Sequence, residues 1–461
     1  MPWLGEIPAD WEVRKLKYAS DINSEALPED TSPDLTLQYV DIGNVDSNGN
    51  ILDVQEMQFE NAPSRARRKV RGGDTIISTV RTYLKAIAYI DTPSDNLIVS
   101  TGFAVLRPTS ELEPKFLWRL VQSQGFVDTV VAHSEGIGYP AIAPTKLAEL
   151  PVWIPSPPEQ RAIAAFLDRE TAKLDTLTRK FERLIEVVQE QRAALISHAV
   201  TKGIPAQGAT HLRTAAVEQD ACASEATWST RGNTEVRCTC YKDSGIPSLG
   251  EIPAHWEVKQ VRYIAESLQT GPFGSQLHSS DYVTSGTPVI NPSHMIDGRI
   301  EPDWDVAIDD ATLERLARHQ LRAGDIVFAR RGELGRCALV TNAEEGWLCG
   351  TGSLRMRPLP EVVDSEYLNT VLSTKGVAEW LLLQSVGSTM DNLNTSILAR
   401  LPLPIPPLPE QRAIAAHLDR ETAKLDALIA KTREAIARLA EYRTALISAA
   451  VTGKIDVRGA V

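Results

Sequence analysis

Cysteine is scarce in this chain of 461 residues. The five cysteines are Cys222, Cys238, Cys240, Cys337 and Cys349. Their number is odd and no two of them have CxxC spacing, which argues against a structural zinc site. So few cysteines suit a reducing compartment, and we expect the protein to be cytoplasmic.

Long apolar runs and an excess of positive charge are also missing. No apolar stretch approaches the roughly 20 residues of a membrane span, and the opening MPWLGEIPAD has no basic region before an apolar core. We therefore expect no membrane contact and no signal peptide. The formal net charge of −12 argues against a protein that coats nucleic acid through bulk positive charge. It leaves room for local basic patches in an acidic frame.

Catalytic motifs are missing as well. The sequence has no P-loop, no GxSxG elbow, no HExxH and no GxGxxG after a predicted strand. Asn291–His294 (NPSH) resembles the NPP[FY] box of adenine methyltransferases but lacks its second proline and its aromatic residue, so we expect a turn. Glu257–Lys259 resembles the end of a nuclease motif, but no Asp-containing strand precedes it. We expect a non-catalytic chain.

What the chain does have is an internal repeat. LGEIPADWEV at Leu4–Val13 returns as LGEIPAHWEV at Leu249–Val258. PEQRAIAAFLDRETAKLDTL from Pro158 returns from Pro409, and RAALISHAVTKGI from Arg192 returns as RTALISAAVTGKI from Arg443. We call these segments the repeated frame. A repeat of about 250 residues is too long for a solenoid, so near-identical frames around unlike inserts predict one scaffold that presents two different contact surfaces.

The register between the copies is almost constant, which indicates that the inserts share a fold as well. Glu159 and Glu410 are 251 positions apart, and so are Asp74 and Asp325. The inserts, at about 19–154 and 265–405, contain short β-branched runs such as Asp74–Val80 and Gly324–Arg330 between turn residues. Helical patterns such as Pro114–Ser123 and Ser365–Thr374 alternate with them, so we predict mixed α/β inserts.

A long helix is predicted after each insert, since proline at the first turn suits a helix start. In both helices apolar residues recur at steps of four and three over about five heptads, which is typical of a coiled coil. We expect the two helices to pair with each other, and a pair of ordinary bundle helices is the alternative. The predicted seam consists of Ile163, Leu167, Leu174, Leu177, Phe181, Leu184, Val188, Leu195, Ile414, Leu418, Leu425, Leu428, Leu439, Tyr442 and Leu446.

These patterns divide the chain into five parts. The stretch between the two copies is poor in large apolar residues and is predicted to be a linker or insertion. The predicted parts are a first domain at 1–156 with an opening segment at 1–18, a first long helix at 157–204, the linker at 205–247, a second domain at 248–406, and a second long helix with a tail at 407–461.

Basic residues gather after matching strands in both inserts. Ser64–Arg71 holds five basic residues in eight positions, and further cations follow the predicted strands of both copies. Arginine can bind guanine edges and phosphates, and lysine binds phosphates; the alternative is a solvated edge paired with carboxylates. The basic candidates for DNA contact are Arg65, Arg67, Arg68, Lys69, Arg71, Arg81, Lys85, Arg330, Arg331 and Arg336.

Two glycine-containing loops of the second insert extend this set. Gly271–Tyr282 combines glycines with Ser, Gln and His, and Gly387–Asn394 is matched by Gly136–Ala143 in the first insert. Glycine permits close backbone approach to a ligand, although each loop could equally be a packing turn. The candidates from these loops are Ser275, Gln276, His278 and Asn392.

The duplicated PEQRAIAA and LDRETAKLD segments, together with WLGEIPADWEV and ALISHAVTKGI, closely resemble the specificity subunit of type I restriction-modification enzymes. The resemblance covers nearly the whole chain. It departs from the family in two places, because the first copy lacks the usual KDSG-like lead and the insertion at 205–240 is longer than expected.

The resemblance implies an α+β chain with an internal pseudo-two-fold repeat. Two target recognition domains would each read half of a bipartite, asymmetric double-stranded DNA sequence. The two long helices would pair antiparallel, set the spacing between the half-sites and dock two methyltransferase subunits, and motor-nuclease subunits would complete the complex. This chain would hold no cofactor; S-adenosylmethionine, and ATP and Mg for restriction, are expected on the partner subunits.

Two other functions remain alternatives at the level of sequence. One is an enzyme, such as a fused nuclease or methyltransferase, which the missing motifs disfavour. The other is a structural coiled-coil adaptor of a multisubunit complex that reads no sequence. Sequence preference toward random duplexes would separate a reader from an adaptor.

Overall fold

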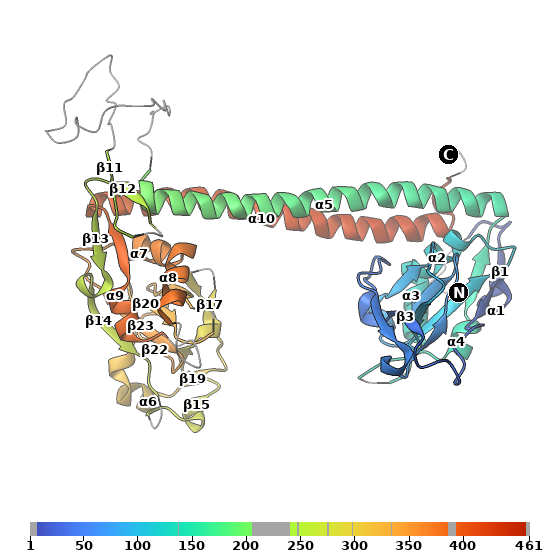
Figure 1. The fold of residues 1–461 in the computed structure, drawn as a ribbon, viewed down its shortest axis with the longest axis horizontal. Helices are drawn as coiled ribbons and strands as arrows, with labels where there is room; N and C mark the ends of the chain where they lie inside the picture. The colour runs from blue at the N-terminus through green and yellow to red at the C-terminus, as the bar shows by residue number, and fades with distance from the viewer. Residues whose placement is uncertain are drawn as a thin grey trace, which may run out of the picture. The chain divides into compact units, whose positions relative to one another are not determined.

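The computed structural model describes residues 7–136, 138–204, 240–246, 249–273, 276–296, 298–332, 334–385 and 393–457. The chain forms two compact units. The first contains Met1–Leu184 and Lys431–Val461, and the second contains Ile185–Ala430. Each unit therefore combines one insert with parts of both long helices (Figure 1).

The first unit contains two four-stranded sheets with the orders β2-β9-β6-β7 and β4-β3-β8-β5. A separate antiparallel pair, β1 with β10, joins the opening segment to the end of the insert. The predicted strand at 74–80 is confirmed as β6. The strands are β1 (Glu12–Lys15), β2 (Ser20–Ile22), β3 (Thr36–Val40), β4 (Gln55–Gln58), β5 (Ala66–Lys69), β6 (Thr75–Ser78), β7 (Ile87–Tyr89), β8 (Leu97–Ser100), β9 (Phe103–Pro108) and β10 (Pro151–Ile154).

Four short helices complete the first insert. They are α1 (Leu16–Ala19), α2 (Pro114–Gln122), α3 (Gln124–Ala132) and α4 (Pro144–Ala148). Helix α2 begins with a proline, as predicted, and buries Phe116, Leu117 and Leu120. These side chains share a core with β9 and with residues of both long helices, so helix α2 packs the insert onto the helix pair.

The second unit repeats this plan with additions. Its sheets have the orders β14-β23-β20-β21 and β15-β19-β16-β22, with pairs β11-β12, β13-β24 and β17-β18. The strands are β11 (Tyr241–Asp243), β12 (Glu251–Pro253), β13 (Glu257–Gln260), β14 (Ala265–Thr270), β15 (Tyr282–Val283), β16 (Thr287–Ile290), β17 (Met295–Ile296), β18 (Arg299–Ile300), β19 (Ala307–Ile308), β20 (Ile326–Ala329), β21 (Cys337–Leu339), β22 (Leu348–Cys349), β23 (Ser353–Pro358) and β24 (Pro402–Ile405). The helices are α6 (Asp310–Arg315), α7 (Ser365–Leu372), α8 (Lys375–Ser385) and α9 (Thr395–Arg400).

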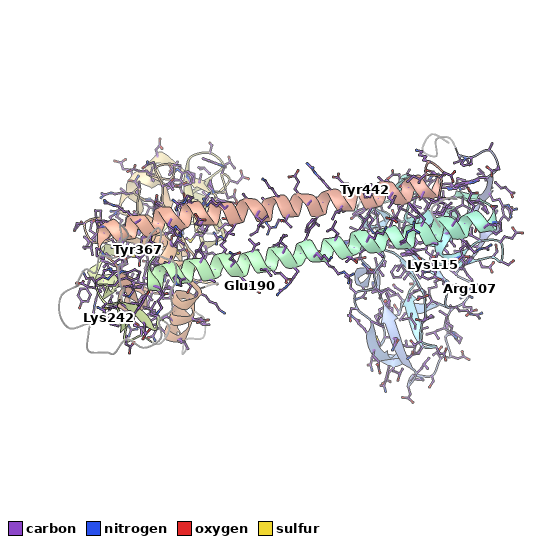
Figure 2. All side chains as sticks on the ribbon, turned by 90° about the horizontal axis from the view of Figure 1, so that it is seen from above. Arg107, Lys115, Glu190, Lys242, Tyr367 and Tyr442 are labelled. Atoms are coloured by element: carbon purple, nitrogen blue, oxygen red, sulfur yellow. The ribbon has the colours of Figure 1, made fainter. Side chains whose placement is uncertain are left out.

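One buried ion pair marks the common plan of the two inserts. Asp74 accepts two hydrogen bonds from the Arg107 guanidinium, at 2.9 and 2.8 Å, and Asp325 accepts two from Arg357, both at 2.8 Å. Both carboxylates are buried, and this bidentate geometry is the strong form of the pair. Arg107 is labelled in Figure 2. The repeated Gly-Asp of the sequence is thus a structural element of both inserts.

The two predicted long helices are α5 (Pro157–Lys202) and α10 (Leu408–Val451). Both begin beside prolines, as expected for residues that suit the first helical turn. In the first unit the start of α5, at Ile163 and Leu167, shares a core with the end of α10, at Leu446 and Ala450. In the second unit the end of α5 shares a core with the start of α10. The helices are therefore antiparallel in each unit, as predicted (Figures 1 and 2).

Two equivalent ion pairs join the helices. In the first unit Arg443 Nε lies 3.4 Å from Asp175 Oδ1, and in the second Arg192 Nε lies 3.0 Å from Asp426 Oδ1. The repeat offset of 251 residues relates Asp175 to Asp426 and Arg192 to Arg443. The two ion pairs are therefore equivalent, and α5 and α10 exchange roles between them. Each arginine occupies an inner position of the seam, where a charged group can fix register.

Eleven of the fifteen predicted seam residues are buried or half-buried, and the other four are exposed. Leu177, Leu184, Leu428 and Tyr442 are exposed, and the residue after each of them turns inward instead. After Leu184 and Leu428 the next residue is also apolar, so the sequence allowed both interpretations there. After Leu177 and Tyr442 the inner residue is polar, Thr178 or Arg443, so the apolar pattern favoured the wrong residue. The predicted positions that are buried or half-buried are Ile163, Leu167, Leu174, Phe181, Val188, Leu195, Ile414, Leu418, Leu425, Leu439 and Leu446.

Charge reversal tests whether the first ion pair fixes the register. The Arg443 side chain is only 12% exposed, so Arg443→Asp leaves two carboxylates together in a partly buried place and should destabilise the first unit by about 1–3 kcal/mol. The double variant Asp175→Arg/Arg443→Asp should regain most of this. Hydrogen exchange of peptides from the first unit measures the effect.

The matched control is Arg192→Asp in the second unit, where the arginine is more exposed and the loss should be smaller. If the double reversal in the first unit is as unstable as Arg443→Asp alone, the pair does not set the register.

The C-terminal boundary predicted for the linker at 205–247 lies too far along the chain, because residues 241–243 form a strand. Strand β11 (Tyr241–Asp243) pairs antiparallel with β12 (Glu251–Pro253), because the repeated opening segment of the second copy supplies its partner. The folded part of the second copy therefore begins before residue 248. Most of the predicted linker, at 205–239, lies outside the described residues.

Candidate nucleic-acid interface

The repeated frame holds each insert through the same side chains. The Trp11 indole donates to Glu159 at 3.1 Å, and the Trp256 indole donates to Glu410 at 3.1 Å. The next residue of the PEQR segment is a fully buried glutamine. Gln160 accepts from the Glu113 backbone at 2.7 Å and donates to two carbonyls. Gln411 repeats all three bonds in the second unit.

These contacts explain why PEQR recurs. A buried amide that satisfies three backbone groups costs free energy if it is removed, because each orphaned group keeps its desolvation penalty. The sequence showed the repeat but gave no role to Trp11, Glu159 or Gln160. Their recurrence in both copies was the signal that could have identified them.

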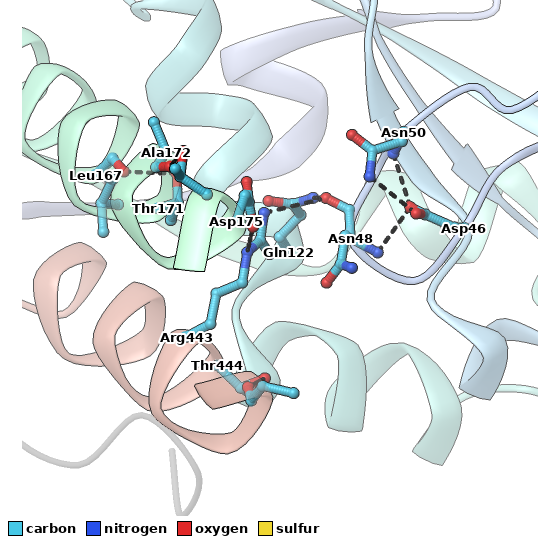
Figure 3. A network of polar contacts seen from close by, with 12 residues as sticks. Asp46, Asn48, Asn50, Gln122, Leu167, Thr171, Ala172, Asp175, Arg443 and Thr444 are labelled. Atoms are coloured by element: carbon cyan, nitrogen blue, oxygen red, sulfur yellow. Dashed lines mark hydrogen bonds and ion pairs between the residues drawn. The ribbon is translucent and has the colours of Figure 1, made fainter. Parts of the chain in front are cut away.

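A polar network fixes the first insert against α10 as well (Figure 3). Asp46 accepts backbone bonds from Asn48 and Asn50 and so closes a turn. The Asn48 carbonyl accepts from Gln122 at 3.0 Å and from Arg443 at 3.4 Å. The same arginine thus contacts the insert and the first long helix.

Backbone hydrogen bonds bring Arg65 and the end of β6 together beside one turn of the first insert. The backbone N–H of Thr101 donates to the Arg65 carbonyl at 2.7 Å, and the backbone and hydroxyl of Thr79 both donate to the Gly102 carbonyl at 2.8 Å. The start of β5 and the end of β6 are therefore brought together beside the β8–β9 turn. We call this region, with the Arg81–Lys85 loop, the first rim.

The basic run at 64–71 is less free than the sequence suggests. Arg65 pairs with Asp41, and Arg71 pairs with Glu25. Arg67 stacks on Phe59, with 4.6 Å from its guanidinium carbon to the ring centre. Arg68 is half-buried, and this burial lowers its pKa. Lys69 is half-buried as well. Because the cations of this run are paired with carboxylates, stacked on a ring or half-buried, the run does not form one continuous phosphate-binding surface.

The other two cations of the first rim lie in a strained loop. Arg81 and Lys85 have φ angles of +50° and +56° and bracket a 3₁₀ turn, Thr82–Leu84. Left-handed backbone costs a side-chain-bearing residue about 1–2 kcal/mol. The Arg81 guanidinium carbon lies 4.3 Å from the centre of the Tyr139 ring, and Lys85 Nζ donates to Gln124 at 2.6 Å.

The second insert builds an equivalent rim with different side chains. The Arg330 backbone N–H donates to the Gly352 carbonyl at 2.9 Å, and its carbonyl accepts from Leu393 at 2.9 Å. Thr79 makes the same two bonds in the first insert, to Gly102 and Ile142. Arg330 is therefore the counterpart of Thr79, whereas the sequence had matched it with the cations near Arg81.

The second rim contains Arg330, Arg331 and Arg336, and these arginines differ in how far other groups of the protein contact or bury their side chains. Arg330 Nε donates to the Leu393 carbonyl at 3.3 Å, and burial, followed by the nearby Arg331, lowers the pKa of Arg330. Arg336 donates to the Pro292 carbonyl at 3.3 Å. Arg331 is exposed and forms no ion pair within the described part of the chain. Arg331 is thus the cation of this rim that is best placed to meet a phosphate.

Two of the remaining candidates, Gln276 and His278, have backbone groups that contact helix α6 and their own loop. Gln276 accepts from Arg315 through its carbonyl at 2.6 Å, and the His278 backbone donates to Asp281 at 2.9 Å. Both lie in the turns before β15, on the other sheet of the insert. Ser275 and Asn392 lie outside the described residues.

The sequences that resembled catalytic motifs are structural. Asn291–His294 opens a 3₁₀ turn in which Asn291 and His294 form a capping box, which confirms the predicted turn. Glu257 and Lys259 lie on β13 and pair with each other at 2.8 Å. No group of three or more His, Cys, Asp or Glu suited to a metal ion occurs among the described residues. In the same part of the chain, every helix is too short or too polar to cross a membrane.

Comparison with known proteins decides the family. Residues 8–186 and 253–438 each match the family described as Type I restriction modification DNA specificity domain. The chain belongs to this family. The two matches cover one copy of the repeat each, so this specificity subunit carries the domain twice.

Individual relatives align along most of the chain. The specificity subunit of the type I restriction enzyme EcoDI from Escherichia coli is 21% identical over 472 residues, covering 98% of this chain and 90% of the relative. The specificity subunit of MjaVIII from Methanocaldococcus jannaschii is 21% identical over 331 residues, covering 71% of this chain and 67% of the relative.

Solved structures show the same fold. One chain, from a study of complex assembly and conformational transition of the type I R-M system, has a TM-score of 0.71 at 22% identity and covers 98% of this chain and 100% of its own length. The HsdS subunit from Thermoanaerobacter tengcongensis has a TM-score of 0.51 at 22% identity, with 98% of both chains covered. The predicted α+β fold with two long helices is confirmed.

Proposed function

We propose that each unit of this specificity subunit reads one half of a bipartite, asymmetric duplex DNA target through its rim. The observation that carries the proposal is the pairing of like backbones with unlike side chains. Thr79 and Arg330 make the same backbone bonds in the two rims. The first rim has at this place a buried threonine whose hydroxyl bonds the Gly102 carbonyl, and the second has a half-buried arginine followed by the exposed Arg331. A fold that keeps the position and changes the chemistry suits two readers of different base sequences.

The chain itself carries no catalytic step in this proposal. Methyltransferase subunits with S-adenosylmethionine, and motor-nuclease subunits with ATP and Mg, supply the chemistry in the cytoplasm. Exposed apolar side chains on the long helices are candidate docking points for these partners, because large apolar groups in water are costly unless covered. They include Leu177 and Tyr442 in the first unit and Leu428 in the second; Tyr442 is labelled in Figure 2.

Selection from random duplexes tests the proposal against a structural adaptor. The subunit, bound to its methyltransferase partners, should enrich a two-part sequence with a gap of fixed length, since base contacts discriminate by about 1–3 kcal/mol each. The methyltransferase subunits alone are the control. An adaptor would enrich no sequence, and the proposal would then fail.

A further inference from the structure

Two of the three non-glycine residues with positive φ among the described residues belong to one loop. They are Arg81 and Lys85, and the third is Asn23. The matching loop of the second insert runs from Gly332 to Gly335, with φ of +81° and +92°. The fold therefore makes this loop with glycine at both bends in one copy and with a cation at both bends in the other.

The strained loop is firmly held. The Arg81 backbone donates to the Pro140 carbonyl at 2.7 Å, and the Thr82 hydroxyl lies 3.1 Å from that of Ser134. Lys85 is tied to Gln124, whose amide in turn donates to Asp128 at 2.6 Å. These contacts hold the loop in the conformation with a left-handed residue at each end. Strained and over-determined residues concentrate at ligand-contacting sites.

The tip between the two cations is apolar and open to solvent. Tyr83 is 51% exposed and Leu84 48% exposed, and Tyr139 beside Arg81 is exposed as well. In the second copy the corresponding leucine, Leu334, is only 8% exposed. The exposed tip is thus a property of the first insert and not a requirement of the fold.

The charges of this loop also differ from those nearby. Arg65 and Arg71 are neutralised by carboxylates. Arg81 contacts an aromatic ring and Lys85 an amide, and within the described part of the chain neither forms an ion pair. Two cations without carboxylate partners on either side of an apolar tip complement a duplex groove, in which phosphates flank base edges that include the apolar thymine methyl group.

We propose that the Arg81–Lys85 loop is the specificity-determining element of the first unit, in which Lys85 and Arg81 bind phosphates and Tyr83 with Leu84 contacts the bases between them. The inference rests on the proposed function and assigns that function to named residues. Thymine methyl groups are the base-edge feature that apolar side chains contact, so the positions read by this tip should include thymine.

The test compares variants of the subunit in complex with its methyltransferase partners on duplexes varied in each half-site. Tyr83→Ala should lower affinity by about 5- to 150-fold on the preferred sequence and relax one or two positions of the first half-site. The second half-site should stay as selective as before. Tyr18→Ala, which removes another exposed tyrosine of the first unit, is the matched control and should change neither half.

A second variant separates binding from folding. Lys85→Gly gives the loop the residue that its counterpart has, so the melting temperature should stay unchanged or rise. Affinity should nevertheless fall by the same factor on all sequences, and the slope of log affinity against log salt should lessen by about one. Both results together identify a cation kept at this bend for phosphate contact.

The outcomes are distinguishable. If the wild-type complex prefers no sequence, the proposed function fails. If it prefers a two-part sequence and Tyr83→Ala leaves the first half unchanged, or weakens both halves equally, the loop is not the reading element. A fall in melting temperature with Lys85→Gly and unchanged affinity would show that Lys85 serves only the fold.

Discussion

Removing one heptad from each long helix should shorten the preferred gap between the two half-sites and leave the recognised bases unchanged. The variant lacks residues 181–187 of α5 and 431–437 of α10, so it keeps both inter-helix ion pairs, Asp175–Arg443 and Arg192–Asp426. Seven residues are about 10 Å of helix, and the gap should shorten by about one to three base pairs. Duplexes with the original gap should then be methylated poorly or not at all.

The control for this experiment is a deletion of the same heptad from α5 alone. It breaks the match between two antiparallel partners and should destabilise the helix pair. Methylation assays on duplexes whose gap is varied one base pair at a time give the result. If the matched deletion still prefers the original gap, the helices do not set the spacing.

Replacing the second insert with a second copy of the first should give a target in which the two halves are the same word in inverted orientation. Operator palindromy mirrors two-fold symmetry in the protein that reads it, and the exchanged chain would carry the same reader twice on a repeated antiparallel frame. The insert exchange should change specificity more than the heptad deletion does, because it replaces one half-site completely and the deletion changes only the gap.

The contacts of the frame indicate that the exchanged chain would fold. Gln411 makes the same two bonds with the second insert, to Asp364 and Val362, that Gln160 makes with Glu113 and Glu111 of the first. In the first unit Arg119 and Lys115 of the insert bond Asp168 of α5. The repeated LDRETAKLD segment places Asp419 at the equivalent position of α10. Lys115 and Arg119 of the transplanted insert could therefore bond Asp419 in place of Asp168.

Sequence repeats and hydrophobic periodicity predicted three features of the fold. These are the duplicated plan, the mixed α/β inserts and the pair of long helices. The seam shows where periodicity stops being enough. Leu177 and Thr178 compete for the same inner position, and hydrophobicity favours the leucine that the structure leaves in water. Antiparallel pairing and the Asp175–Arg443 contact decide between them, and both depend on residues far apart in the chain.

The candidate site was predicted only in outline. Basic residues after matching strands were found from the sequence, but their partners were not, since Asp41 and Glu25 lie far from Arg65 and Arg71 along the chain. The positive φ of Arg81 and Lys85 could not be predicted either. Glycine normally marks a left-handed bend, and only the second copy has glycine there.

Methylated sites in the DNA of cells that express the wild-type complex, or the complex with two first inserts, test the central claim most directly. The wild-type sites should share two unlike words at a fixed gap. The exchanged complex should methylate an inverted repeat of the first word. Two unlike words in both maps, or an exchanged complex that folds and assembles but methylates without sequence preference, would contradict the assignment of one half-site to each unit.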